Sequence, residues 1–206
     1  MEKDNNNSLH FDIIKINEYP WMASIADSQE SQFCGGTLIA SQWVFTAAHC
    51  MFKDSAGTQP QTAGDLLVVL GEHDLLTEGE ASKIAKKVLK VSKIINHKDY
   101  NSPSPTNNDI TLLKLAEEVD INTYTPACLP STADNFEGKN AWVYGKETIK
   151  YLSKRQKIIK GWGTTDYGAA SSTKLLEVEV PVVSNAVCAA AMPEFTVRNT
   201  FYQKTY

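Results

Sequence analysis

The stretch that decides the fold is Trp43-Val44-Phe45-Thr46-Ala47-Ala48-His49-Cys50. It begins with apolar and β-branched residues, as a buried strand does, and small residues then lead to an imidazole and a thiol. Such a strand places a titratable ring at the border between core and solvent, where a general base belongs. The alternative is a structural histidine that hydrogen-bonds a backbone carbonyl. Cys34, in the preceding apolar segment, is the obvious disulfide partner for Cys50 if the two lie close in space.

Length and charge exclude several classes of protein. The chain has 206 residues, enough for one large all-β domain or two small ones with a substantial core. Its 20 basic and 24 acidic side chains give a formal charge of −4, which gives no support to a nucleic-acid partner. No apolar run approaches the length of a membrane span, and the N-terminus lacks the apolar core of a signal peptide.

The cysteines are Cys34, Cys50, Cys128 and Cys188, and they fit neither zinc-ribbon nor redox-motif spacing. The sequence therefore predicts no metal site, and a disulfide is the better interpretation for at least one pair. A disulfide implies an oxidising compartment, which conflicts with the missing export signal. We take the conflict as a sign of an incomplete N-terminus.

Short apolar segments separated by polar and glycine-containing clusters predict an all-β sandwich or barrel. After a polar tail over residues 1–12, the expected strands are Trp21–Ile25, Phe33–Ala40, Trp43–Thr46, Leu66–Leu70, Lys83–Ile95, Asp109–Leu115, Ala141–Tyr144 and 176–180. Residues 83–95 also carry apolar side chains at helical spacing. Their valine and isoleucine content favours a strand.

Three further segments lie outside this strand pattern. Pro126 and Pro130 predict a connector between two halves. Ser184 and Asn185 predict a cap for a short helix over residues 186–192. The lysine-rich segment 146–160 has two interpretations, a basic amphipathic helix for an anionic surface or a solvated inserted loop, and charge runs favour the loop.

Several motifs occur in the order found in one family of hydrolases. They are Glu18-Tyr19-Pro20-Trp21-Met22-Ala23-Ser24, Phe33-Cys34-Gly35-Gly36-Thr37-Leu38-Ile39, Trp43 through Cys50, Asn108 through Leu115, and Gly161-Trp162-Gly163-Thr164-Thr165. Together they resemble the trypsin- and chymotrypsin-like serine endopeptidases, over about residues 18–192. The combination is specific, because independent motifs agree in order.

The resemblance implies two six-stranded antiparallel β-barrels with the active site in the cleft between them. It places the first, complete barrel at residues 13–125 and a partial second barrel at 126–206, with the basic insert at about 146–160. By position, His49 matches the general base and Asp109 the carboxylate that orients it. Cys34 and Cys50 match the bridge beneath the histidine.

The family's nucleophile segment, Gly-Asp-Ser-Gly-Gly-Pro, is absent from these 206 residues. Ser171, Ser172 and Ser184 lack the glycine-flanked turn that presents a hydroxyl and aims amides at an oxyanion. We therefore expect these 206 residues to be inactive by themselves, although the full-length form would hydrolyse peptide bonds through an acyl-enzyme. The alternative is a non-catalytic serine protease homologue that binds or regulates partners.

The resemblance also implies partners and a location. It implies protein or peptide substrates, protease inhibitors as further partners, and an extracellular site of action. It implies no cofactor. A calcium ion held by Glu72 and Glu80 is a weaker expectation than ordinary loop charges, because no complete ligand set is visible. Cys128 and Cys188 are expected to be unpaired, and a partial second barrel is expected to expose strand edges that favour aggregation.

Overall fold

The computed structural model describes residues 12–15, 18–54, 58–72, 84–103, 107–145, 147–152, 156–161, 176–184, 186–187 and 190. Strands and short 3-10 helices make up most of its regular structure over these ranges, and residues 186, 187 and 190 are helical. The strands are β1 (Asp12–Ile13), β2 (Met22–Ala26), β3 (Gln32–Ala40), β4 (Trp43–Thr46), β5 (Leu67–Leu70), β6 (Lys87–Asn96), β7 (Thr111–Leu115), β8 (Asn140–Gly145), β9 (Glu147–Leu152), β10 (Gln156–Gly161) and β11 (Leu176–Pro181). The 3-10 helices are η1 (Ala48–Met51) and η2 (Ala63–Asp65). Within the described residues, no helix is long and apolar enough to cross a membrane.

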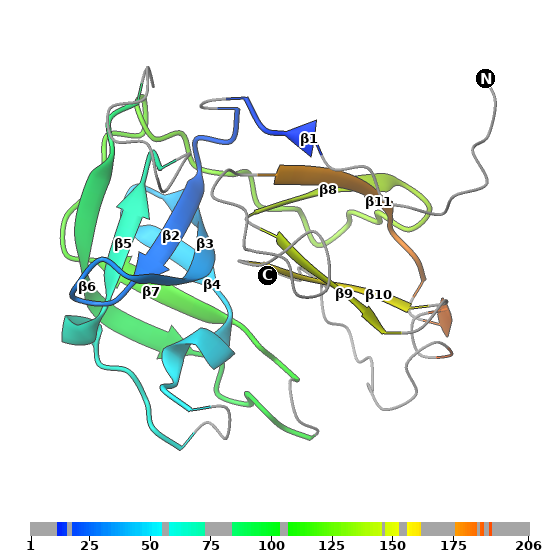
Figure 1. Ribbon diagram of the computed structural model, residues 1–206, viewed down its shortest axis with the longest axis horizontal. Coiled ribbons are helices and arrows are strands. Elements are labelled where there is room, and N and C mark those ends of the chain that lie inside the picture. Colours follow the sequence, from blue (N-terminus) through cyan, green and yellow to red (C-terminus); the bar gives the residue numbers. More distant parts are fainter. Residues whose placement is uncertain are drawn as a thin grey trace.

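Six strands close into an antiparallel barrel, in the order β2-β3-β4-β7-β6-β5, with β5 pairing back to β2. Figure 1 shows this barrel as the blue to green half of the molecule. Alternation along the strands fills its interior. In β7, for example, Thr111, Leu113 and Leu115 are buried while the residues between them are partly exposed. The all-β fold predicted from the sequence is confirmed.

The packing around Gly36 explains why the Cys34-Gly35-Gly36 motif has a glycine at this position. A Cβ atom built on Gly36 would lie 2.8 Å from Cγ1 of Val44 and 3.1 Å from the carbonyl oxygen of Phe45. Val44 is fully buried, so its methyl group has little room to move. The close approach of β3 to β4, which leads directly into η1, therefore requires a residue without a side chain.

A second sheet has the strand order β1-β11-β8, with antiparallel pairs throughout. It lies beside the barrel in Figure 1. Among the described residues, hydrogen bonds connect both this sheet and the segment before it with the residues of the barrel. The Tyr19 hydroxyl donates to the Glu177 carboxylate, and the Ala127 amide donates to the Leu38 carbonyl oxygen at 2.9 Å. The division into domains at residues 125 and 126 remains a prediction, and β1 at the expected start of the first domain pairs with β11.

The strand prediction for residues 83–95 is confirmed from Lys87 onward by β6, whereas residues 84–86 are not in a strand. Leu89 and Val91 point into the core, whereas Val88 and Ile95, which share the alternative helical face, are more than a third exposed. The pairing of β6 with β7 is irregular between Val91 and Lys93, so the strict alternation of apolar and polar residues does not continue through the strand.

The lysine-rich segment is different from both interpretations. β9 and β10 form an antiparallel hairpin in which Ile149 pairs with Ile159 and Thr148 pairs with Lys160. The amphipathic helix is therefore wrong, and the described residues, 147–152 and 156–161, are paired strands where a loop was expected. The isoleucine and threonine residues at the paired positions have high strand propensity.

Candidate active site

Strand register brings the two predicted site residues together. Thr46 at the end of β4 pairs with Thr111 at the start of β7. In an antiparallel pair the residues after one strand lie opposite those before its neighbour. His49, just beyond β4 in η1, therefore lies next to Asp109, just before β7. The separation of 60 residues along the chain is bridged by a single strand pair.

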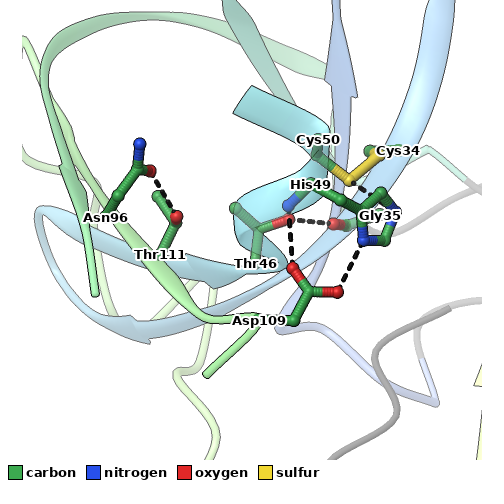
Figure 2. A network of polar contacts seen from close by, with 8 residues as sticks. All are labelled: Cys34, Gly35, Thr46, His49, Cys50, Asn96, Asp109 and Thr111. Carbon is green, nitrogen blue, oxygen red and sulfur yellow. Dashed lines mark hydrogen bonds and ion pairs between the residues drawn. A yellow bond between two sulfur atoms is a disulfide. The ribbon is translucent and has the colours of Figure 1, made fainter. Parts of the chain in front are cut away.

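Asp109 holds His49 at two points. Its Oδ1 accepts a hydrogen bond of 2.7 Å from the His49 backbone amide, and its Oδ2 lies 2.7 Å from His49 Nδ1. Figure 2 shows both contacts, with the carboxylate below the ring and the η1 backbone above it. The Asp109 side chain is 26% exposed and that of His49 is 55% exposed. The ring is thus fixed at one edge and open to solvent.

The contact with Asp109 defines the form of the imidazole. A carboxylate can only accept a hydrogen bond, so Nδ1 must carry the proton. In the neutral ring Nε2 then holds a lone pair, which is the form required of a general base. This arrangement can accept a proton at Nε2 while the carboxylate stabilises the resulting positive charge.

Cys34 and Cys50 form a disulfide with a Cα–Cα distance of 6.2 Å. It ties β3 to η1 across 16 residues of sequence. Both cysteines are nearly buried, and Cys50 Sγ lies 3.6 Å from His49 Nε2. Figure 2 shows the sulfur bridge against the ring. The disulfide therefore fixes the turn that carries the histidine and contacts the ring itself.

Sequence reasoning missed two threonines that brace the strand ends beneath the site. The Thr46 hydroxyl donates to the Gly35 carbonyl oxygen at 2.8 Å, and the Thr111 hydroxyl donates to Asn96 Oδ1 at 2.6 Å (Figure 2). Both threonines are buried. A buried hydroxyl needs a partner, so a threonine at the end of an apolar strand is the signal that could have indicated these bonds.

The loop that leads into Asp109 is also fixed by a side chain that sequence reasoning did not assign. Asn108 adopts a left-handed conformation with φ of 54°. Its side-chain amide donates to the carbonyl oxygens of Asp99 at 2.9 Å and Ser102 at 3.0 Å. Asparagine tolerates this conformation better than most residues. Asn108 thus closes the loop immediately before the carboxylate.

Tyr100 is a further neighbour that the sequence analysis did not single out. Its ring stacks on Phe52 with ring centroids 5.6 Å apart. Burial, and then the negative charge of Asp109, raise the pKa of the Tyr100 phenol, although the Asn101 side chain opposes the shift. Phe52 follows η1 directly, so the stacking joins the residue after the His49 segment to the loop that precedes Asp109. No pattern of spacing points to Tyr100.

One of the two carboxylates of the weaker calcium expectation, Glu72, pairs with a lysine. Lys86 Nζ lies 3.1 Å from a Glu72 carboxylate oxygen and 3.3 Å from one of Glu30. Burial lowers the pKa of Lys86, but the hydrogen bonds and charges of the two glutamates outweigh it and raise the pKa overall. Glu72 is thus engaged by a side-chain ammonium. Glu80 and His73 lie outside the described residues.

Other residues named from the sequence are only partly described. Gly161 ends β10, whereas Trp162, Gly163 and Cys188 lie outside the described residues. The Ser184 hydroxyl accepts a hydrogen bond from the Val187 amide at 3.2 Å, as a helix cap does, but most of the expected helix over 186–192 is outside the described part. Cys128 is exposed and has a free thiol.

Comparison with known proteins gives consistent matches. The family model described as Trypsin matches residues 12–206. The chain is 32% identical over 176 residues to "Serine protease filzig" of Drosophila melanogaster, covering 82% of this chain and 9% of that protein. It is 30% identical over 194 residues to "Ovochymase-2" of Mus musculus, covering 94% and 27% respectively.

A third relative is "Trypsin" of Phaedon cochleariae, 32% identical over 188 residues, which are 91% of this chain and 62% of that protein. The chain therefore spans less than two thirds of the length of each of these relatives. The family model nevertheless covers the closed barrel, the second sheet and the His49–Asp109 pair together. The chain belongs to the trypsin family of serine proteases.

Proposed function

We propose that this chain is part of a serine endopeptidase in which His49 is the general base and Asp109 orients it. The observation that carries the proposal is the contact of 2.7 Å between His49 Nδ1 and Asp109 Oδ2. It leaves the Nε2 lone pair for a serine hydroxyl, and the exposed ring gives a substrate access. Family membership supports the same assignment.

The reaction follows from these two side chains. Nε2 would take the proton of the attacking hydroxyl as the hydroxyl oxygen bonds to the peptide carbonyl carbon. Asp109 would stabilise the imidazolium, which then gives its proton to the leaving amine. Water would repeat the sequence on the acyl-enzyme and release the acid. Nucleophile and oxyanion hole would come from residues outside the printed sequence, which has no Gly-Asp-Ser-Gly-Gly segment.

We propose protein or peptide substrates and an extracellular location for the complete enzyme. Family membership supports the substrate class, and the Cys34–Cys50 disulfide supports an oxidising compartment. We also keep the division into a first barrel at 13–125 and a second unit from 126, since the strands of the closed barrel all fall within residues 22–115.

The first test uses a polypeptide of these 206 residues. We expect no hydrolysis of peptide anilides above the rate of the His49→Ala variant, because neither contains the nucleophile. Hydrolysis that disappears in His49→Ala would show that a serine within the 206 residues is the nucleophile, and it would contradict the assignment of that role to another segment.

A second candidate function is that of a non-catalytic protease homologue that binds partners. Sequencing of the transcript separates the two. A reading frame that encodes this segment after Tyr206 supports the enzyme, and a stop codon directly after Tyr206 supports the binding protein.

A further inference from the structure

Cys34, His49 and Cys50 form a cluster of potential metal ligands. Their two sulfurs and one ring nitrogen all lie within 4.8 Å of one another. Thiolate and imidazole are the ligands that zinc prefers. While the sulfurs are bonded to each other they cannot act as thiolates, so the metal-binding capacity of the cluster depends on the redox state.

We propose that reduction of the Cys34–Cys50 disulfide creates a zinc site made of both thiolates and Nε2 of His49, with water as the fourth ligand. A dithiol reductant supplies two electrons and two protons and itself becomes a cyclic disulfide. The sulfur–sulfur bond breaks and two thiols form. Binding of Zn²⁺ then releases the two thiol protons to solvent.

The distance between Cys50 Sγ and His49 Nε2 fits tetrahedral zinc. With Zn–S of about 2.3 Å and Zn–N of about 2.0–2.1 Å, a sulfur and a nitrogen on one tetrahedral zinc lie about 3.6 Å apart. The Cys50 Sγ and His49 Nε2 atoms are 3.6 Å apart. The two sulfurs must separate to about 3.8 Å, which the Cα–Cα distance of 6.2 Å permits through side-chain rotation.

The residue that orients a zinc-bound histidine is already present. A histidine that binds zinc through one nitrogen usually donates the other N–H to a carboxylate, which fixes the tautomer and raises the basicity of the ligand. Asp109 Oδ2 lies 2.7 Å from Nδ1 of His49, and Oδ1 accepts from the backbone amide of the same residue. The exposed side of the ring leaves room for ion and water to enter.

Zinc binding at this site would affect the proposed role of His49 as general base. The zinc site does not depend on that role. Zinc would occupy the Nε2 lone pair that a general base needs. The same histidine could then serve catalysis only in the oxidised protein. The experiment below measures metal binding, so it can fail or succeed independently of protease activity.

The test uses a Cys128→Ser, Cys188→Ser background, which removes the other thiols. The protein is reduced, freed of reductant without oxygen and titrated with Co²⁺. We expect about one cobalt per chain, a thiolate-to-cobalt charge-transfer band, tetrahedral visible bands and displacement by Zn²⁺. The oxidised protein should show none of these signals. Absence of the charge-transfer band in the reduced protein would overturn the proposal.

Variants decide whether the site belongs to the folded barrel. His49→Ala should weaken cobalt binding at least 10-fold, and Asp109→Ala should weaken it about 10- to 100-fold. His97→Ala is the matched control and should leave the affinity unchanged. If the reduced chain bound cobalt only as an unfolded polypeptide, Asp109→Ala would have no effect, because residue 109 would no longer lie near residue 49. That result would contradict the proposal.

Discussion

Asp109 contacts His49 through both of its carboxylate oxygens, one on the backbone amide and one on Nδ1, each at 2.7 Å. Two acceptors on one rigid group fix the position and the rotation of the ring together. The contact with the backbone amide requires the turn of η1, which starts one residue after the end of β4. The contact with the ring requires the tautomer that carries its proton on Nδ1. The strand pair β4–β7 therefore positions the imidazole ring of His49.

Asp109→Asn should change the tautomer of His49. The asparagine side chain has only one acceptor oxygen, which must serve the backbone N–H of His49 because that group can only donate. The NH₂ group then faces Nδ1, so Nδ1 must accept and the ring carries its proton on Nε2. Nitrogen NMR of the imidazole should show Nδ1–H in the parent chain and Nε2–H in the variant. Unchanged nitrogen shifts would mean that Asp109 does not control the ring.

Gly36→Ala should destabilise the barrel by about 1–3 kcal/mol, because the new methyl group collides with the side chain of Val44 and approaches the Phe45 carbonyl. Gly64→Ala is the matched control, since its nearest neighbour would be Thr62 Oγ1 at 3.9 Å. Urea unfolding measures both. Equal effects of the two substitutions would refute the packing argument for the motif.

Asn108→Ala should destabilise the chain more than Asn108→Gly. Both variants lose the hydrogen bonds to Asp99 and Ser102, but only alanine is strained in the left-handed backbone conformation of residue 108. That strain, about 1–2 kcal/mol, exceeds the flexibility cost of glycine, about 0.4–1 kcal/mol. The free energies of unfolding of the two variants check this. A glycine variant less stable than the alanine variant would be inconsistent with it.

Tyr100→Phe should make stability less dependent on alkaline pH. Since the pKa of Tyr100 is raised in the folded chain, its contribution is complete below the unfolded value of about 10 and is lost as pH rises through the higher folded value. Phenylalanine keeps the stack on Phe52 and has no proton to lose. The unfolding free energy of the variant should therefore fall less steeply above about pH 10.

A second variant tests the cause of that slope. Asp109→Asn removes the charge that adds to burial, so it should reduce the alkaline slope in part. An alkaline slope that is the same in the parent chain and in Tyr100→Phe would show that the phenol does not contribute.

The sequence predicted the strands of the barrel well, because alternation and β-branched residues act locally. The predicted and observed strand 43–46 coincide. The segment 146–160 was harder, because a few isoleucines and leucines among lysines fit helical spacing as well as a hairpin. Its pairing of Ile149 with Ile159 depends on a partner strand that periodicity does not reveal.

Around the site, too, the sequence pattern reveals strand ends but not contacts made by loops. His49 and Asp109 stand out because each lies at the end of an apolar strand, and the family motifs include both. Tyr100 and Asn108 lie in a polar loop, and the contacts that bring them near Asp109 depend on how that loop folds. The engagement of Glu72 by Lys86 is equally invisible in the sequence, because Glu30 joins it from the turn between β2 and β3.

The most direct test of the account is the rate of peptide-anilide hydrolysis by the longest natural product of this gene, with and without His49→Ala. We predict hydrolysis by a product that contains the serine segment, and a loss of about 10⁴-fold or more in the variant, because the serine hydroxyl loses its general base. Hydrolysis that survives His49→Ala, or no hydrolysis by a product with the serine segment, would contradict it.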